Sequence, residues 1–183
     1  CAPSGSTGRQ RVTTTDLVGG FGYNGSASPG GDYTNTFSGT SAATPVVAGV
    51  VALVLNANPN LGWRDVQEIL MVTAKKNDSS NADWINNGSP DSAKVFHFNH
   101  AYGAGLVDAN AAVLRAATWT NLGARTSHTL TQSALNQTIP DANSTGVSRT
   151  FDFSGLAQLR VGHVQVTVDV THSFRGDLQF EVT

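Results

Sequence analysis

A small-residue turn leads directly into an apolar run at residues 39–55, and no other part of this sequence constrains the fold as strongly. Large apolar side chains recur there at the spacing of one helical stripe, at Val47, Val50, Val51, Val54 and Leu55. The small residues between them are Ala48, Gly49 and Ala52. A helix with one apolar side and one small side is typical of a protein interior, so we expect it to be buried within a parallel sheet.

Shorter elements are predicted on both sides of this helix. The sequence Asn58-Pro59-Asn60 ends it, and helical spacing resumes at residues 63–74. Asp108 is a typical cap for a further short helix at residues 109–116. We also predict a strand at residues 11–17, a glycine-rich loop at residues 19–32, and a polar loop at residues 75–92 packed by Trp84.

The pattern changes at Trp119, after which helix signals give way to short alternating runs. Val164 to Val170 alternate strictly, and a second alternating run follows the tripeptide Arg175-Gly176-Asp177. The tripeptide matches an adhesion motif, but its place between two such runs predicts a turn with solvated charges. We therefore divide the chain into residues 1–118 and residues 119–183, the latter being the start of an unfinished β-sandwich or barrel.

Composition excludes several functions. Only 13% of residues are charged and the formal net charge is −2, so no basic face is available to neutralise nucleic-acid phosphates. The single cysteine, Cys1, excludes an internal disulfide and a cysteine-cluster metal site. The apolar run Val46–Leu55 is far shorter than the roughly 20 residues that span a bilayer, so we predict a buried helix and no membrane span. Because the chain starts at Cys1 and stops within an alternating run, we expect it to be part of a longer protein.

Ser41 is the candidate nucleophile. In the first turn of a helix its backbone N–H has no intrahelical partner, so it can point at a developing oxyanion with help from the helix dipole. Gly39 allows close approach of a substrate, and Pro45 removes the usual donor to the Ser41 carbonyl. Taken alone, a Gly-Thr-Ser before an apolar helix is more often an ordinary cap.

A longer match favours the catalytic interpretation. The sequence Gly39-Thr40-Ser41-Ala42-Ala43-Thr44-Pro45 followed by Val47-Ala48-Gly49 closely resembles the serine motif of subtilisin-like proteases, the subtilases. Residues 56–67, NANPNLGWRDVQ, are similar to the continuation found in the kexin and furin branch. Tyr102 to Ala109, then Trp119, resemble the end of that branch's catalytic domain, and residues 172–178 resemble a hairpin of its P domain.

The resemblance implies an α/β fold, with part of a subtilisin-like parallel sheet and its packed helices, followed by part of an all-β sandwich P domain that packs on the catalytic domain. It implies a secreted or extracellular serine endopeptidase that acts on proteins or peptides through an Asp, His, Ser triad in that order, with an oxyanion Asn. It also implies Ca²⁺ for the full-length enzyme. The long glycine-rich insertion at residues 17–32 favours a bacterial-type relative.

Of the triad and oxyanion residues that the resemblance implies, only the serine, Ser41, lies within this chain. No histidine precedes it, and the family's Asp, His, oxyanion Asn, specificity-pocket acids and usual calcium ligands all lie further upstream than this chain extends. Asp16 and Asp32 are therefore interpreted as strand-end and loop residues. We expect the 183-residue chain alone to be inactive and the parent protein to be active.

The sequence leaves three other interpretations open. The nucleophile elbow of an α/β-hydrolase esterase matches loosely at Ser41, but residues 32–36 are too polar for the buried strand that it requires. Its partners would be later residues such as Asp83, Asp91, His97, His100 and His128. A metal site at Asp91, His97 and His100 needs a helix, whereas their surroundings predict an extended segment with the two rings on opposite faces. A non-catalytic interaction module remains the alternative for the isolated chain.

Overall fold

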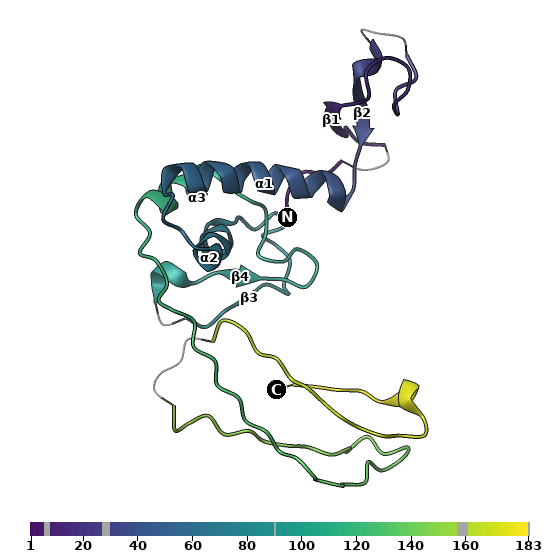
Figure 1. Cartoon of the computed structure of the whole chain (residues 1–183), viewed down its shortest axis with the longest axis vertical. Coiled ribbons are helices and arrows are strands. Elements are labelled where there is room, and N and C mark those ends of the chain that lie inside the picture. Colours follow the sequence, from purple (N-terminus) through teal and green to yellow (C-terminus); the bar gives the residue numbers. More distant parts are fainter. Residues whose placement is uncertain (6–7, 27–29, 90, 157–160, 183) are drawn as a thin grey trace. The chain divides into compact units, whose positions relative to one another are not determined.

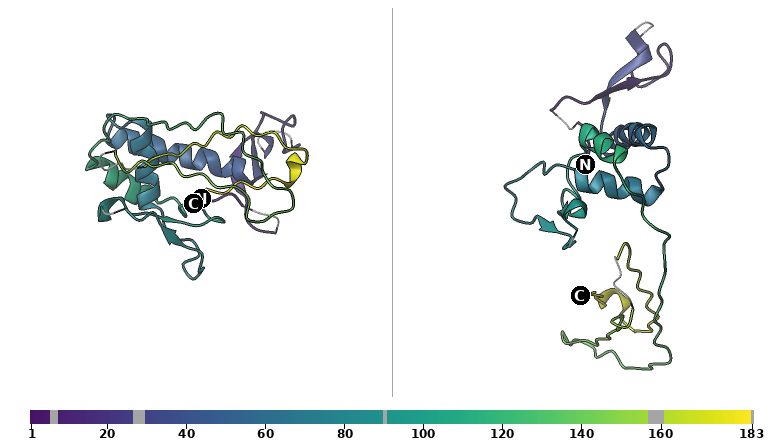
Figure 2. Two further views of the ribbon diagram at one scale, coloured as in Figure 1. Left: turned by 90° about the horizontal axis from the view of Figure 1, so that it is seen from below. Right: turned by 90° about the vertical axis from the view of Figure 1, so that its left-hand side faces the viewer.

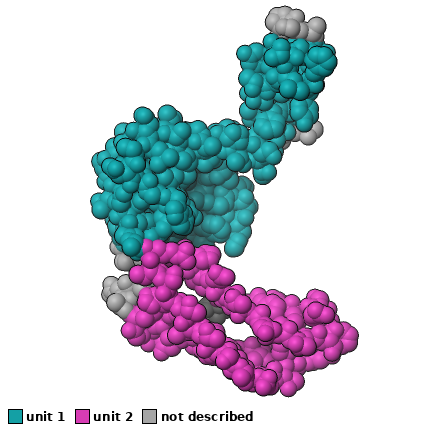
Figure 3. All heavy atoms as spheres, in the orientation of Figure 1, with its two compact units in different colours: residues 1–124 teal, residues 125–183 magenta. Residues whose placement is uncertain are grey.

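The computed structural model describes residues 1–5, 8–26, 30–89, 91–156 and 161–182. It divides into two compact units, Cys1–Ala124 and Arg125–Thr183, which Figure 3 colours separately. Figures 1 and 2 show the elements, which are β1 (Val12–Thr15), η1 (Gly30–Asp32), β2 (Tyr33–Phe37), α1 (Thr40–Ala57), α2 (Trp63–Thr73), β3 (Ile85–Asn86), η2 (Ser92–Lys94), β4 (His97–Phe98), α3 (Ala109–Ala117) and η3 (Arg175–Asp177).

The core of the first unit lies among its three α-helices. α1 packs against α3, and α2 packs against both, in line with the apolar spacing of each helix (Figure 1). The buried apolar side chains of this core are Val50, Val54, Leu61, Val66, Ile69, Ala112, Ala116 and Trp119. Each large aliphatic side chain buried in this way contributes about 1.5–3 kcal/mol to folding, so these helices hold most of the apolar stabilisation of the unit.

The predicted helix boundaries are confirmed to within a residue. Asn58 ends α1, and α2 runs from Trp63 to Thr73. The predicted cap of α3 is also present, because a carboxylate oxygen of Asp108 accepts a hydrogen bond from the backbone N–H of Ala111 at 3.0 Å. That cap supplies an acceptor for an N–H group that the helix itself leaves unpaired.

The burial expected for α1 is wrong for this chain. Only Ala42, Val50 and Val54 of its residues are buried, while Leu53 is 54% exposed. The physical reason is that the small-residue side of α1, at Ala48, Gly49 and Ala52, is left uncovered within the described residues. Among the described residues, α1 is the one helix whose length and apolar composition would allow it to cross a membrane; core helices of globular proteins share this property.

The described strands form two antiparallel pairs and not the parallel sheet that we expected. β1 pairs with β2 in the register Val12 to Phe37 and Thr15 to Tyr33, with an irregularity between Val12 and Thr14. Thr15 at the end of β1 lies opposite Tyr33 at the start of β2, as in an antiparallel hairpin. β3 pairs with β4 in the same sense, inside the predicted polar loop and just after it.

The second unit does not show the predicted β-sandwich. Its described residues contain η3 but no strand, and the large side chains of the alternating run, including Val161, Val164, Val166 and Val168, are at least half exposed. An alternating strand buries one face only when it has both ladder partners and a second sheet to cover it. The sandwich stays a prediction, whereas the turn predicted at Arg175-Gly176-Asp177 is confirmed as η3.

Candidate active site

Ser41 lies just after the β1–β2 hairpin in the chain. β2 ends at Phe37, and three residues later the chain turns into α1 through Gly39, whose φ of 84° lies in the left-handed region that favours glycine. Gly39 is the residue that caps α1, so Ser41 is the second residue of the helix. The glycine thus sets the angle at which the serine leaves the strand and enters the helix.

The reactive groups of Ser41 are free. Ser41 is exposed, and within the described residues neither its hydroxyl nor its backbone N–H makes a hydrogen bond. The next two N–H groups are already used, because those of Ala42 and Ala43 donate to the Gly39 carbonyl at 3.0 and 3.3 Å. The Ser41 N–H therefore remains available at the positive end of the helix dipole, as an oxyanion donor must be.

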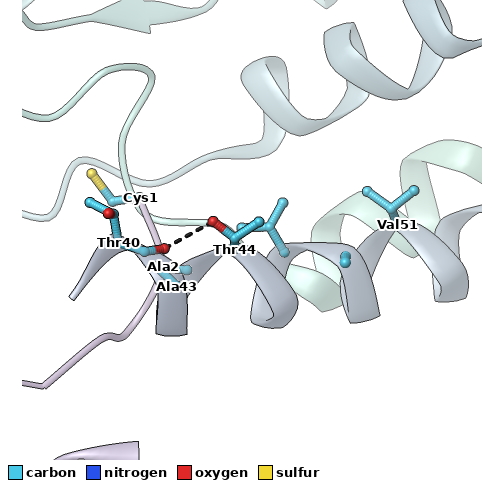
Figure 4. Close-up of a pocket in the computed structure, with 8 residues that line it drawn as sticks. Cys1, Ala2, Thr40, Ala43, Thr44 and Val51 are labelled. Atoms are coloured by element: carbon cyan, nitrogen blue, oxygen red, sulfur yellow. Dashed lines mark hydrogen bonds between the residues drawn. The ribbon is translucent and has the colours of Figure 1, made fainter. Parts of the chain in front are cut away.

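The helix just after Ser41 is locally irregular. Pro45 lies inside α1 and has no N–H, so the Ser41 carbonyl lacks the donor normally found four residues further on. The hydroxyl of Thr44 donates to the Thr40 carbonyl at 2.9 Å, which gives that carbonyl an additional partner (Figure 4).

An apolar cavity of about 650 Å³ lies along α1 beside this turn. The residues that line it are Cys1, Ala2, Thr40, Ala43, Thr44, Val47, Ala48 and Val51 (Figure 4). Cys1 is fixed there by the turn before α3, since its thiol donates to the Tyr102 carbonyl at 2.9 Å and its carbonyl accepts from the Val107 N–H at 2.9 Å. Ser41 itself does not line this cavity.

The two acidic residues before Ser41 have structural partners. The carboxylate of Asp16 accepts from the N–H groups of Leu17 and Asn24 at 2.9 and 2.8 Å. The carboxylate of Asp32 accepts from the Gly19 N–H at 2.9 Å, and its carbonyl accepts from the Asp16 N–H at 2.8 Å. Their predicted roles as strand-end and loop residues are confirmed.

Comparison with known proteins identifies the segment around this serine. The family model described as "Subtilase family" matches residues 17–105, which include Gly39 and Ser41. Residues 17–105 therefore resemble the subtilase family. A crystal structure of the serine protease of Aeromonas sobria matches the fold with a TM-score of 0.53 and 28% identity, over 63% of this chain and 24% of that protein.

The most similar curated relatives include proprotein convertases. The chain is 40% identical over 152 residues to a PC3-like endoprotease, variant B, of Hydra vulgaris, covering 81% of this chain and 21% of the relative. It is 37% identical over 155 residues to the mouse proprotein convertase subtilisin/kexin type 7, covering 81% of this chain and 19% of the relative. The chain therefore spans about a fifth of the length of these relatives.

The subtilase segment does not bring a base to Ser41. Within the part of the chain that the structure describes, no hydrogen bond joins Ser41 to any candidate of the esterase interpretation, which are Asp83, Asp91, His97, His100 and His128. β2 does precede Ser41 directly, but Thr34 is the one buried residue of its five, so it is not the buried strand of a nucleophile elbow. The expectation that this stretch is too polar for a buried strand is confirmed.

The two central histidines have structural surroundings. The ring of His97 packs edge-on against Trp84 at 5.0 Å between ring centres, and that of His100 packs against Phe98 at 5.3 Å. Burial, together with the charge of Lys76, lowers the pKa of His97 below its usual value. Its buried Nε2 has no hydrogen-bond partner among the described residues. Within the described ranges, no three His, Cys, Asp or Glu side chains gather as a metal site would require.

The sequence patterns assign no role to Asp65 of α2. Asp65 is buried, and one carboxylate oxygen accepts from the Trp119 indole N–H at 2.9 Å and the Leu122 N–H at 2.7 Å. The other accepts from the Gly62 N–H at 2.8 Å. Burial alone raises the pKa of Asp65, but these hydrogen bonds and the charge of Arg64 outweigh it, so the pKa lies below its usual value.

The signal that could have identified this role is the position of Asp65 as the third residue of α2, where a carboxylate caps the helix. Neighbouring side chains support the same contact, since Arg64 donates to the Gly123 carbonyl at 3.0 Å and Asn58 donates to the Ala116 carbonyl at 3.1 Å. We call this set of contacts between residues 58–65 and residues 116–123 the Asp65 anchor. It ties the end of α3 and the segment after it to the start of α2.

Proposed function

We propose that this chain carries the nucleophile segment of a subtilisin/kexin-like serine endopeptidase. The hydroxyl of Ser41 is the nucleophile, and its backbone N–H is one donor of the oxyanion hole. The observation that carries the proposal is the pairing of a free hydroxyl and a free N–H on an exposed residue at the start of α1, inside the subtilase match. An ordinary helix cap would instead use its hydroxyl to accept from a backbone N–H of the same turn.

In this mechanism the Ser41 oxygen attacks the peptide carbonyl while a base removes its proton. The carbonyl oxygen becomes an oxyanion that accepts a hydrogen bond from the Ser41 N–H. The base then returns the proton to the leaving amine, and water hydrolyses the acyl-enzyme by the reverse sequence. Since no histidine lies among residues 1–40, the base, its orienting Asp and the oxyanion Asn come from elsewhere in the parent protein.

The activity therefore belongs to the parent protein. The substrates are proteins or peptides, and the protein is secreted or extracellular, as resemblance to the kexin and furin branch implies. Residues 119–183 begin its P domain, which packs on the catalytic domain. Nucleic acid is not a partner, because the chain has 11 basic and 13 acidic residues and no basic cluster of its own.

Calcium is proposed for the parent protein only. Calcium needs six to eight oxygen ligands. Among the described residues no three acidic or histidine side chains gather at one place, and Asp16 and Asp32 already accept backbone hydrogen bonds. These residues do not fit a calcium site, so no step of the mechanism is routed through one.

A fluorophosphonate probe tests the proposal, because it labels only a serine that a base activates. We expect stoichiometric labelling of Ser41 in the parent protein, with the modified peptide identified by mass spectrometry, and none in the 183-residue chain. Ser41→Ala should abolish labelling, whereas Ser38→Ala, three residues away, should retain it. A folded parent protein that hydrolyses no peptide and takes no label would contradict the proposal and favour a non-catalytic interaction module.

A further inference from the structure

His97 has a buried ring nitrogen that lacks a hydrogen-bond partner. The side chain is half-buried, and its Nε2 atom makes no hydrogen bond among the described residues. Its ring packs edge-on against Trp84, with 5.0 Å between the ring centres. A protonated imidazole carries an N–H on both nitrogens, so protonation would put a charged, unpaired donor at Nε2. The folded arrangement therefore suits the neutral ring.

The backbone of a neighbouring turn lies against this nitrogen. Lys75 and Leu106 form an antiparallel bridge in which each N–H donates to the other's carbonyl, at 2.8 and 2.7 Å. Gly105 lies directly before Leu106 with a φ of 101°. A Cβ at Gly105 would overlap the Lys75 carbonyl and come within 3.2 Å of the His97 Nε2. The unpaired nitrogen is thus next to the turn that brings Leu106 to the bridge.

This bridge joins two helices of the core. α2 ends at Thr73, two residues before Lys75, and Leu106 lies two residues before Asp108, which caps α3. The Lys75 ammonium also forms an ion pair with the Asp108 carboxylate at 2.5 Å. We call Lys75, Leu106 and Asp108 the α2–α3 junction. Movement of the turn at Gly105 away from Lys75 would open this junction.

The charges around His97 disfavour its protonation. The Lys76 ammonium lies 5.5 Å from the centre of the Trp84 ring, and no carboxylate among the described residues forms an ion pair with His97. The other titratable groups on the segments next to the ring have partners of their own, which are Asp108 for Lys75, Asp78 for Tyr102, and the Gly105 carbonyl for the amine of Cys1. Burial, together with Lys76, accordingly lowers the pKa of His97.

We propose that the α2–α3 junction is a pH-sensitive switch and that His97 is its sensor. The junction is closed while the ring is neutral. When the ring takes a proton from solvent, the charged N–H at Nε2 needs water, so the turn at Gly105 moves away and the two hydrogen bonds of the Lys75–Leu106 bridge break. The ring returns its proton when the pH rises, which makes the change reversible. The inference concerns contacts inside the first unit and does not rest on the proposed protease function.

Amide hydrogen exchange of the parent protein tests the switch, because exchange reports local opening. After correction for the pH dependence of intrinsic exchange, the Lys75 and Leu106 amides should lose protection between about pH 7.5 and about pH 5. The loss should approach tenfold for each unit by which the folded pKa of His97 lies below its unfolded pKa. In His97→Phe the protection should be equal at both pH values, because phenylalanine keeps a packed ring but takes no proton.

A second pair of variants decides the matter if His97→Phe does not fold. Lys76→Met removes the cation that opposes protonation, so it brings the folded pKa of His97 closer to the unfolded one and should make the loss of protection smaller. Lys76→Arg keeps the charge and should keep the wild-type loss. His100→Phe is the matched control, because His100 is exposed and packs against Phe98; this variant should respond to pH as the wild type does.

Three outcomes would overturn the inference. The first is protection of the bridge amides that does not change with pH in the wild type. The second is the same loss in His97→Phe, or in both Lys76 variants, as in the wild type. The third is an equal loss at Val54 in the helical core, which would mean that acid unfolds the whole unit. Labelling of Ser41 is a separate readout, so its failure would contradict the protease function and leave the switch standing.

Discussion

The Asp65 anchor allows the most quantitative test of the fold, through the substitution Asp65→Ala. The buried carboxylate accepts three hydrogen bonds, and removing it leaves the Trp119 indole N–H and the Leu122 and Gly62 N–H groups without their acceptor. A hydrogen bond to a charged group contributes about 1.5–3 kcal/mol, and part of the sum is offset by the cost of burying the carboxylate. We expect Asp65→Ala to lower the local free energy of opening by about 3–5 kcal/mol.

Asp65→Asn separates geometry from charge. One carboxylate oxygen serves both Trp119 and Leu122, and the amide oxygen of asparagine can replace it. The amide nitrogen then faces the Gly62 N–H, donor against donor. This variant should lose less than Asp65→Ala, about 1–2 kcal/mol, because one hydrogen bond and the negative charge are lost.

Amide hydrogen exchange of residues 117–124 measures this loss in a protein of any length, since exchange reports local opening. Asp83→Ala, which removes an exposed carboxylate, is the matched control and should change exchange little. The Asp65 pKa is lowered in the folded state, so the anchor's contribution is full above the unfolded pKa and lost as pH falls through the folded pKa. The reasoning is refuted if Asp65→Ala and the wild type differ in the free energy of local opening by less than about 0.5 kcal/mol at neutral pH, which is the effect of an ordinary surface substitution.

Three further predictions concern the serine turn and the aromatic cluster. Gly39→Ala forces a Cβ into a left-handed conformation, which costs about 1–2 kcal/mol, and should slow fluorophosphonate labelling of Ser41 in the parent protein. The pKa of His97 is lowered in the folded state, so the free energy of unfolding falls as the pH drops from the unfolded pKa of His97 towards its folded pKa. His97→Phe should flatten that part of the stability–pH curve, which urea titrations can measure. Trp84→Ala removes the ring against which His97 packs and should cost about 2–3 kcal/mol in the same titrations.

Local patterns were enough to predict the helices. The apolar spacing of α2 and the Asp108 cap of α3 are short-range properties, and both helices appear within a residue of their predicted ends. The place of Ser41 near the start of α1 follows from the same kind of pattern. Its catalytic role stays a prediction, because that depends on groups which no pattern within these residues supplies.

Long-range contacts were beyond the reach of those patterns. Asp65 looks like a solvated helix residue in the sequence, and its burial depends on Trp119 and Leu122, which follow it by more than fifty residues. The Asp65 anchor also keeps residues 119–124 with the first compact unit, although the composition already changes at Trp119. A change of composition marks where side-chain preferences change, whereas a unit ends where tertiary contacts end.

The uncovered side of α1 and the unpartnered Ser41 have a common explanation under the proposed function. A helix with small residues at Ala48, Gly49 and Ala52 is suited to close packing against other backbone, yet in the described residues that side is exposed. The same helix presents a serine with a free hydroxyl and a free N–H but no base. If the parent protein supplies both a covering sheet and the base, then covering α1 and activating Ser41 should occur together, and hydrogen exchange of α1 should slow in the form of the protein that takes the fluorophosphonate label.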